Sequence, residues 1–234
     1  LVEGENAAML VDTGYGIEDV ADFMRHMTDL PLTVFLTHNH HDHAMGARCF
    51  PETYMLEADM ADWDMFTNDK MRRRVLTQAI GKNLTVDEKT FLAGEIPLPK
   101  VMKPGVIDLG GLTAEIIEAP GHTPGSAVVY VPERKLLLSG DDWNPCTWLF
   151  FPQALGLREY RSNMRGIQQL PFEKVLCPHR EALYDRWMFD DFFNALTDGN
   201  LRAAEPVNIA PYEQIDTCQA TLPHDQVFVF DWAK

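Results

Sequence analysis

The segment FLTHNHHDHAMG, residues 35–46, concentrates side chains that can bind a metal ion. Six consecutive positions hold four of the eight histidines in the chain, together with one carboxylate. Imidazole is a borderline-soft nitrogen ligand and carboxylate is a hard oxygen ligand, so the two together suit Zn²⁺ and also iron or manganese. Without a cation, so many titratable groups would repel one another and lose hydration on burial. The motif H-x-H-x-D-H therefore predicts a metal site.

The spacing within this motif predicts which ligands act together. The histidines follow LTVFLT, a β-branched stretch that predicts a strand. Side chains two positions apart on an extended segment point the same way, so His38 and His40 can reach one metal ion. Once the chain turns, Asp42 and His43 can reach a neighbouring ion.

Three further ligand types follow later predicted strands. His122 lies in the tight turn APGHTPGS, Asp141 ends the stretch LLLSGD, and His179 follows VLCP. Each is ordinary alone, because a strand-terminal aspartate is usually a turn former and a histidine after proline is often merely exposed. Together with the motif, however, four strand ends each donate a ligand type, and we expect them to meet in one centre.

This order of motifs, from VDTG at Asp12 to His179, resembles the metallo-β-lactamase superfamily. The resemblance implies a site for two metal ions, with two Zn²⁺ expected and iron or manganese as alternatives. The implied ligands are His38, His40 and His122 for the first metal, Asp42, His43 and His179 for the second, and Asp141 as the bridge between them. Asp12 matches a family position that supports the site by orienting a ligating imidazole.

The elements that must position these ligands alternate strand and helix at first and form a β-meander after about residue 106. This alternation favours an α/β (α+β) fold. The resemblance implies a four-layer αββα sandwich of two mixed β-sheets flanked by helices, with the site at one edge. We expect a single domain over residues 1–234, in which residues 58–105 form a helical insertion or lid. The family's first strand is expected to precede Leu1.

Apolar spacing also predicts individual elements outside the motif. Helices are expected over residues 17–27, 156–170 and 182–199, and a last strand over residues 226–232. The intervening segment DWNPCTWLFFPQALG, residues 142–156, is predicted as an apolar loop.

The aromatic residues of that loop follow Asp141 directly. Beside a metal site, Trp143, Trp148 and Phe150 would line a pocket for an apolar or acyl group, and Arg180 would contact an anion. The alternative is that the rings pack under the following helix or at a contact between two copies of the chain.

The resemblance implies a hydrolase. In such a site two metal ions would lower the pKa of a bridging water toward about 7, and the resulting hydroxide would attack a carbonyl carbon or a phosphorus. Asp42 is the predicted catalytic residue, which would pass a proton to the leaving group. The expected substrate is a small ester, thioester or lactone. The alternatives are a phosphodiester or phosphonate hydrolase, an iron-dependent oxidoreductase of the same fold, and a site that binds ligand without turnover.

Departures from particular members narrow these options. Antibiotic-hydrolysing zinc lactamases commonly carry a cysteine where this chain has Asp141, which disfavours penicillin hydrolysis. Flavodiiron oxidoreductases usually carry glutamate in place of His40, and quorum-quenching lactonases carry a tyrosine shortly after the bridging aspartate, which DDWNPCTW lacks.

Composition limits the partners. With 20 basic and 35 acidic residues the formal charge is −15, which speaks against nucleic acid and against an anionic membrane. No apolar run reaches the roughly 18 residues of a membrane span, and no secretory signal is visible. The four scattered cysteines favour reduced thiols and a cytoplasmic location. We expect a small-molecule substrate, and a homodimer is left open.

Overall fold

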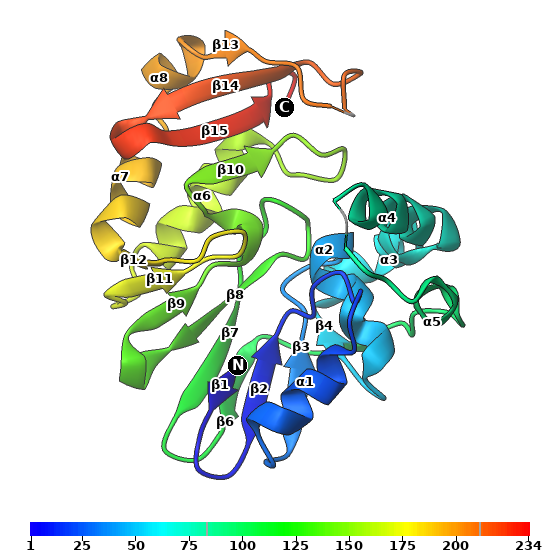
Figure 1. Cartoon of the computed structure of the whole chain (residues 1–234). Coiled ribbons are helices and arrows are strands. Elements are labelled where there is room, and N and C mark those ends of the chain that lie inside the picture. Colours follow the sequence, from blue (N-terminus) through cyan, green and yellow to red (C-terminus); the bar gives the residue numbers. More distant parts are fainter. Residues whose placement is uncertain (83, 211) are drawn as a thin grey trace. The chain divides into compact units, whose positions relative to one another are not determined.

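The computed structural model describes residues 1–82, 84–210 and 212–234. Asn83, which falls within the predicted insertion over residues 58–105, and Pro211 lie outside the described residues. The chain divides into two compact units, Leu1–Ala114 and Glu115–Lys234, and Figure 1 follows their elements in sequence order. The single domain expected from the sequence stays a prediction.

The first unit contains a mixed sheet. Its strands, in order across the sheet, are β1 (Val2–Glu3), β2 (Ala8–Val11), β3 (Leu32–Phe35), β4 (Tyr54–Met55) and β5 (Lys100–Val101). β1 is antiparallel to β2, whereas β2, β3, β4 and β5 run parallel to one another. Val11 at the end of β2 lies opposite Phe35 at the end of β3, so the residues that follow both strands emerge at the same edge.

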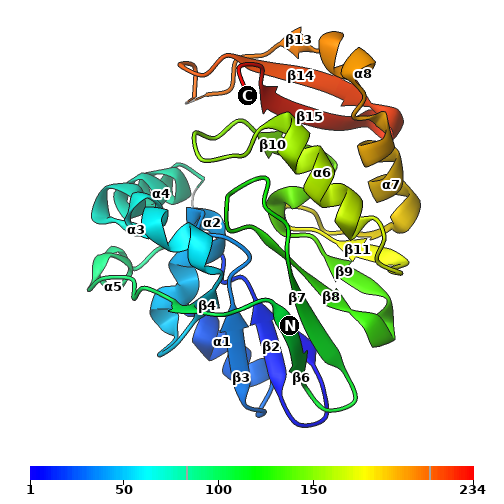
Figure 2. The ribbon, with the colours of Figure 1, turned by 180° about the vertical axis from the view of Figure 1, so that it is seen from behind.

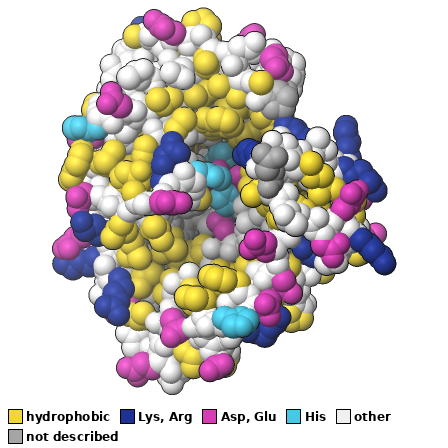
Figure 3. All heavy atoms as spheres, viewed as in Figure 1, with side chains coloured by type: hydrophobic (Ala, Val, Ile, Leu, Met, Phe, Trp, Pro, Cys, Tyr) yellow, Lys and Arg dark blue, Asp and Glu magenta, His cyan; other side chains and the backbone are white. Residues whose placement is uncertain are grey.

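Helices and short turns complete the first unit. They are α1 (Val20–Met27), α2 (His41–Ala44), η1 (Met45–Cys49), η2 (Glu57–Asp62), α3 (Trp63–Thr67), α4 (Asp69–Gly81) and α5 (Glu88–Leu92), and the strand β6 (Gly105–Asp108) follows them. α1 begins three residues after the predicted start because the Asp19 side chain caps it, accepting a hydrogen bond from the backbone of Asp22. Lys and Arg side chains stand out where α4 and α5 lie (Figure 3).

The second unit contains two mixed sheets. In one, the order is β12 (Leu183–Asp185), β11 (Lys174–Leu176), β9 (Leu136–Leu138), β8 (Ala127–Val131) and β7 (Thr113–Glu118), whose first two residues belong to the first unit. In the other, the order is β10 (Cys146–Leu149), β15 (Gln226–Asp231), β14 (Thr217–Leu222) and β13 (Glu205–Pro206). Two of the pairings are parallel, β9 with β11 and β10 with β15. The strands β9 and β11 therefore also end at one edge.

Two segments of the second unit differ from the sequence expectation. The predicted loop over residues 142–156 contains the strand β10, because its backbone pairs with β15 far along the chain. The predicted helix over residues 182–199 begins as the strand β12, which pairs with β11, and only Arg186–Ala195 form the helix α7. In both segments a backbone pairing with another strand overrides the local pattern. The partner is distant in sequence for β10 and close in sequence for β12.

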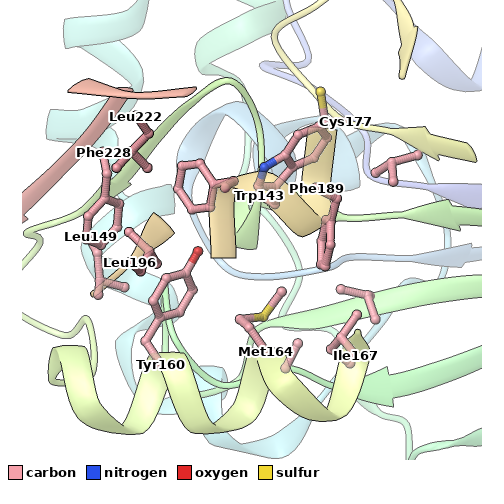
Figure 4. Close-up of a cluster of buried hydrophobic side chains, with 14 of the residues drawn as sticks. Trp143, Leu149, Tyr160, Met164, Ile167, Cys177, Phe189, Leu196, Leu222 and Phe228 are labelled. Atoms are coloured by element: carbon pink, nitrogen blue, oxygen red, sulfur yellow. The ribbon is translucent and has the colours of Figure 1, made fainter. Parts of the chain in front are cut away.

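The remaining helices of the second unit contribute side chains to its hydrophobic core. They are α6 (Leu157–Ile167) and α8 (Asp198–Arg202), with the short turns η3 (Pro132–Arg134), η4 (Gly140–Asp142) and η5 (Pro223–Asp225). α6 faces the reader in Figure 2, with α7 beside it. Tyr160, Met164 and Ile167 recur at helical spacing on the buried face of α6 and belong to the same core cluster as Trp143 and Phe189 (Figure 4). Burial of this face fixes α6 on the strands that carry the site.

Candidate metal centre

In the first unit, Asp12 organises the start of the histidine motif. It follows β2 with a left-handed backbone, φ +62°, and its amide donates to the carbonyl of Phe35 at 2.8 Å. Its Oδ1 accepts the Thr37 amide at 2.7 Å, and its Oδ2 accepts His43 Nδ1 at 2.8 Å. The Thr37 hydroxyl also lies 2.9 Å from Oδ2. A single carboxylate thus joins the end of β2 to both ends of the motif.

These hydrogen bonds fix the tautomers of two histidines. A carboxylate only accepts, so His43 donates from Nδ1. The Thr37 hydroxyl donates its one hydrogen to Asp12, so its oxygen accepts from Nδ1 of His38, 3.1 Å away. In the neutral rings, Nε2 is then the nitrogen that carries the lone pair, which is the form that binds a metal ion. This is the geometry that the supporting role predicted for Asp12 requires.

The donor atoms of the motif lie close together. The His38 ring centroid is 4.7 Å from that of His40 and 4.1 Å from that of His43. A donor atom of His38 lies within 4.8 Å of one on His40 and of one on His43, and Asp42 and His43 meet the same limit. All three histidines are buried. The ring of His41 lies edge-on to that of Tyr15, with the two centroids 5.6 Å apart.

A close backbone approach holds this turn in place. The amide and hydroxyl of Thr13 both donate to the carbonyl of His43, each at 2.8 Å. The amide of Gly46 donates to the carbonyl of Gly14 at 3.0 Å, and a Cβ on Gly46 would lie only 2.2 Å from the carbonyl oxygen of Thr13. Glycine is therefore required at this position for the motif to pack against the residues that follow β2.

In the second unit, the turn between β7 and β8 presents His122. Its backbone amide donates to Asp142 Oδ1 at 3.1 Å, and its ring Nδ1 lies 2.7 Å from the carbonyl of Trp148. A carbonyl only accepts, so Nδ1 carries the hydrogen and Nε2 carries the lone pair of the neutral ring. The ring is 2% exposed and packs edge-on against Phe151 at 5.4 Å. His122 is therefore held in the same tautomer as His38 and His43.

Asp141 lies between two histidines of the second unit. Its Oδ2 is 3.5 Å from Nε2 of His122, and its Oδ1 is 3.2 Å from Nε2 of His179. His179 follows β11 with a left-handed backbone, φ +63°. Each carboxylate oxygen thus faces a different imidazole, which is the arrangement expected of a carboxylate that joins two ligand sets. The donors of both units, neutral imidazoles and carboxylates, fit zinc, iron or manganese.

A buried tyrosine supports the turn that carries Asp141. The Tyr160 hydroxyl donates to the carbonyl of Asp142, and a Cβ on Gly121 would lie 2.4 Å from the Tyr160 ring. Burial, followed by the negative charge of Asp142, raises the pKa of Tyr160 well above its usual value. The hydroxyl therefore stays protonated and remains a donor to this turn.

Replacing Tyr160 by phenylalanine is expected to lower the free energy of unfolding by about 1–3 kcal/mol, because a buried carbonyl loses its donor. Tyr184→Phe is the matched control, since Tyr184 forms no side-chain hydrogen bond within the described residues. Its effect should stay within about 0.5 kcal/mol. Urea unfolding of both variants measures the difference, and equal stabilities would contradict the supporting role of Tyr160.

The four residues predicted to face a substrate have different environments. Trp143 is fully buried and packs against Phe189 of α7, and Phe150 is also fully buried. Their burial favours the packing role that the sequence also allowed. Trp148 is partly buried and Arg180 is exposed, with the Arg180 side chain donating to the carbonyl of His179 at 2.9 Å. A substrate-facing role for these residues stays a prediction.

Comparison with known proteins identifies the family. The sequence matches the metallo-beta-lactamase superfamily over residues 1–179. It is 26% identical over 202 residues to acyl-coenzyme A thioesterase MBLAC2 of Gallus gallus, covering 76% of this chain and 70% of that protein. For the bovine and human proteins of the same name, the match spans 60% of their length.

Solved structures share the fold. A metallo-beta-lactamase from Pontibacter korlensis superposes with a TM-score of 0.57 at 18% identity, covering 82% of this chain and 83% of that one. TTHA1623 in a di-iron-bound form superposes with a TM-score of 0.52 at 22% identity, covering 77% and 85%.

The chain belongs to the metallo-β-lactamase superfamily. The predicted α/β class and metallo-β-lactamase fold are confirmed, and the chain is an enzyme, a hydrolase of this superfamily. Among the described residues, no helix has the length and apolar character to cross a membrane.

Proposed function

We propose that this chain is a thioesterase that hydrolyses an acyl thioester at a site for two metal ions. The observation that carries the proposal is the position of Asp141, whose two carboxylate oxygens face His122 and His179 separately. Family membership and the relatives named acyl-coenzyme A thioesterase support the reaction and the substrate class. The donor chemistry of both units supports metal binding.

The proposed ligands keep the order that the family resemblance implies. They are His38, His40 and His122 for one metal, Asp42, His43 and His179 for the other, and Asp141 shared between them. This set contains nitrogen and oxygen donors without a thiolate, so it does not by itself select zinc over iron or manganese. Metal analysis of the purified protein is therefore part of the test.

The proposal assigns a task to each residue around the candidate metal centre. When bound, the metal ions supply Lewis acidity at the thioester carbonyl and lower the pKa of an attacking water. Asp12, directly and through Thr37, keeps the hydrogen of His43 and of His38 on Nδ1, and the Trp148 carbonyl does so for His122. Asp42 would take up a proton released by the attacking water at a carboxylate oxygen and pass it to the leaving thiolate. Trp148 and Arg180 remain the proposed substrate-facing residues.

The balance of the reaction is simple. The oxygen of one water forms a bond to the acyl carbon while the carbon–sulfur bond breaks, so the products are a carboxylic acid and a thiol. No oxidant or reductant is consumed, which separates this proposal from an oxidoreductase of the same fold.

A substrate panel with metal removal tests the proposal. Purified protein should release thiol from acyl-coenzyme A, detected with a thiol-reactive dye, faster than it cleaves oxygen esters, lactones or phosphodiesters. Dialysis against a chelator should lower the rate at least about a hundredfold, and added zinc, iron or manganese should restore it. Two metal ions per chain are expected by elemental analysis. Preferential phosphodiester cleavage, or full activity without metal, would refute the proposal.

A further inference from the structure

Apart from the candidate metal centre, the second unit holds a cavity of about 570 Å³ with an unusual lining. It lies between α6, α8 and the segment 232–234, and Figure 2 shows α6 and α8 on the near side. Four arginines and one lysine line it, but only one carboxylate does. The chain as a whole has a formal charge of −15, but the lining of this cavity carries a net positive charge.

The arginines come from a single face of α6 and from α8. Arg158, Arg161 and Arg165 are spaced three and four residues apart, which places them on one side of the helix. Like charges at this spacing repel one another, and Arg202 of α8 adds a further cation to the same lining. The repulsion is relieved when an anion lies between them.

Internal partners account for only two of these cations. Arg161 pairs with Asp198 at 2.7 Å, and this contact holds the pKa of Asp198 below its usual range. Lys234 donates from Nζ to backbone carbonyls of the segment 151–154 at 2.7–2.8 Å.

The other three cations are exposed and form no such direct contact, although the charge of Arg202 also helps to lower the pKa of Asp198. Within the described residues, the side chains of Arg158, Arg165 and Arg202 form neither a hydrogen bond nor an ion pair. Three guanidinium groups in one cavity are therefore available to a ligand.

The lining also offers a flat aromatic surface. Trp232 is 51% exposed, although its ring is among the most hydrophobic side chains. An indole face stacks well on a nucleobase, and the planar fork of arginine matches the oxygens of a phosphate group. The cavity volume lies within the range of about 300–1,000 Å³ that is typical of small-molecule sites.

We propose that this cavity binds the phosphate groups and the base of a phosphorylated nucleotide. The phosphates contact Arg158, Arg165 and Arg202, and the base stacks on Trp232. Two sources share this chemistry, a free nucleotide and the nucleotide part of a coenzyme A thioester. The second source rests on the proposed thioesterase function.

Binding of nucleotides to the intact chain tests the site directly. Calorimetric titration with ATP and with coenzyme A should detect binding that weakens with rising salt. The variant carrying Arg158→Ala, Arg165→Ala and Arg202→Ala should bind both at least about tenfold more weakly. The control carries Arg25→Ala, Arg73→Ala and Arg134→Ala, which removes the same charge from exposed positions outside the cavity. Unchanged affinity in the first variant, or an equal loss in the control, overturns the site.

A single substitution tests the base separately. Trp232→Ala should weaken the binding of ATP and coenzyme A several-fold while leaving the binding of inorganic phosphate unchanged. If ATP, coenzyme A and inorganic phosphate all bind the Trp232→Ala protein as they bind the original protein, the nucleotide assignment is overturned.

Kinetics distinguish the two sources. If the nucleotide belongs to the substrate, the triple cavity variant should lower kcat/KM for acyl-coenzyme A, relative to that for the same acyl thioester of N-acetylcysteamine, at least about tenfold. The control triple variant should keep the ratio. An unchanged ratio together with weakened ATP binding assigns the cavity to a free nucleotide. If no thioester is cleaved, the proposed thioesterase function is refuted, but the titrations still show whether the cavity binds a nucleotide.

Discussion

Asp141→Asn is expected to lower kcat/KM for thioester hydrolysis by about a thousandfold or more in a protein that remains folded. The reason is the position of its carboxylate, with one oxygen toward His122 and the other toward His179. Removing a residue that only orients a ligand already costs about 10–100-fold in metal affinity or activity, and loss of the ligand proposed to be shared by two ions should cost more. Asparagine keeps the shape of the side chain but removes its charge and one anionic oxygen.

Thiol release measures the rate, and elemental analysis should show fewer than two metal ions per chain. Asp191→Asn provides the control, because Asp191 also faces a histidine in the second unit, His224, at 2.9 Å, but both side chains are more than 40% exposed. That variant should keep its activity and metal content. Wild-type kcat/KM in Asp141→Asn would show that this carboxylate does not serve the reaction.

Local sequence patterns predicted several elements around the candidate metal centre. The strand β3 forms at the apolar stretch before the histidine motif, and α6 forms where residues 156–170 show helical spacing. Both patterns depend only on residues that are close in sequence. β10 was missed because its pairing partner, β15, begins only at Gln226. The first residues of the helix predicted over residues 182–199 form the strand β12 for a different reason. The strand β11 lies just before them in sequence and offers a ladder of backbone hydrogen bonds.

The supporting residues of the candidate site are harder to predict from sequence than its proposed ligands. Histidines and aspartates indicate metal binding by their type and spacing. Thr37, in contrast, can orient His38 only because Asp12, 25 positions earlier, accepts its hydroxyl hydrogen. The only hint in the sequence of a supporting role for Thr37 was the position of this residue between the predicted strand and His38. The carbonyl of Trp148 had no signal at all, because any residue type supplies a backbone carbonyl. Partners of this kind become visible only when the backbone is traced.

Asp12→Asn is expected to weaken metal binding by about 10–100-fold and to lower the proposed thioesterase activity in parallel at limiting metal. Asn tolerates the left-handed backbone that Asp12 adopts, so the substitution tests the carboxylate rather than the turn. An amide accepts through one oxygen only, whereas Asp12 accepts from Thr37 through Oδ1 and from His43 through Oδ2. The His43 ring therefore loses the partner that keeps its hydrogen on Nδ1. Competition with a metal-binding dye measures the affinity.

A graded series separates this orienting role from a general loss of stability. Thr37→Val removes the hydroxyl that links His38 to Asp12 but leaves the direct contact between Asp12 and His43, so its effect should be smaller than that of Asp12→Asn. Asp225→Asn is the backbone control, because Asp225 is also an aspartate with a left-handed backbone, φ +57°, and should bind metal normally. If Asp12→Asn, Thr37→Val and Asp225→Asn all bound metal equally well, the hydrogen bonds of Asp12 would not set the ligand geometry. The expected order follows from the contact that each substitution removes. Asp12→Asn removes the charged contact to His43, Thr37→Val removes the neutral hydroxyl beside His38, and Asp225→Asn removes neither contact.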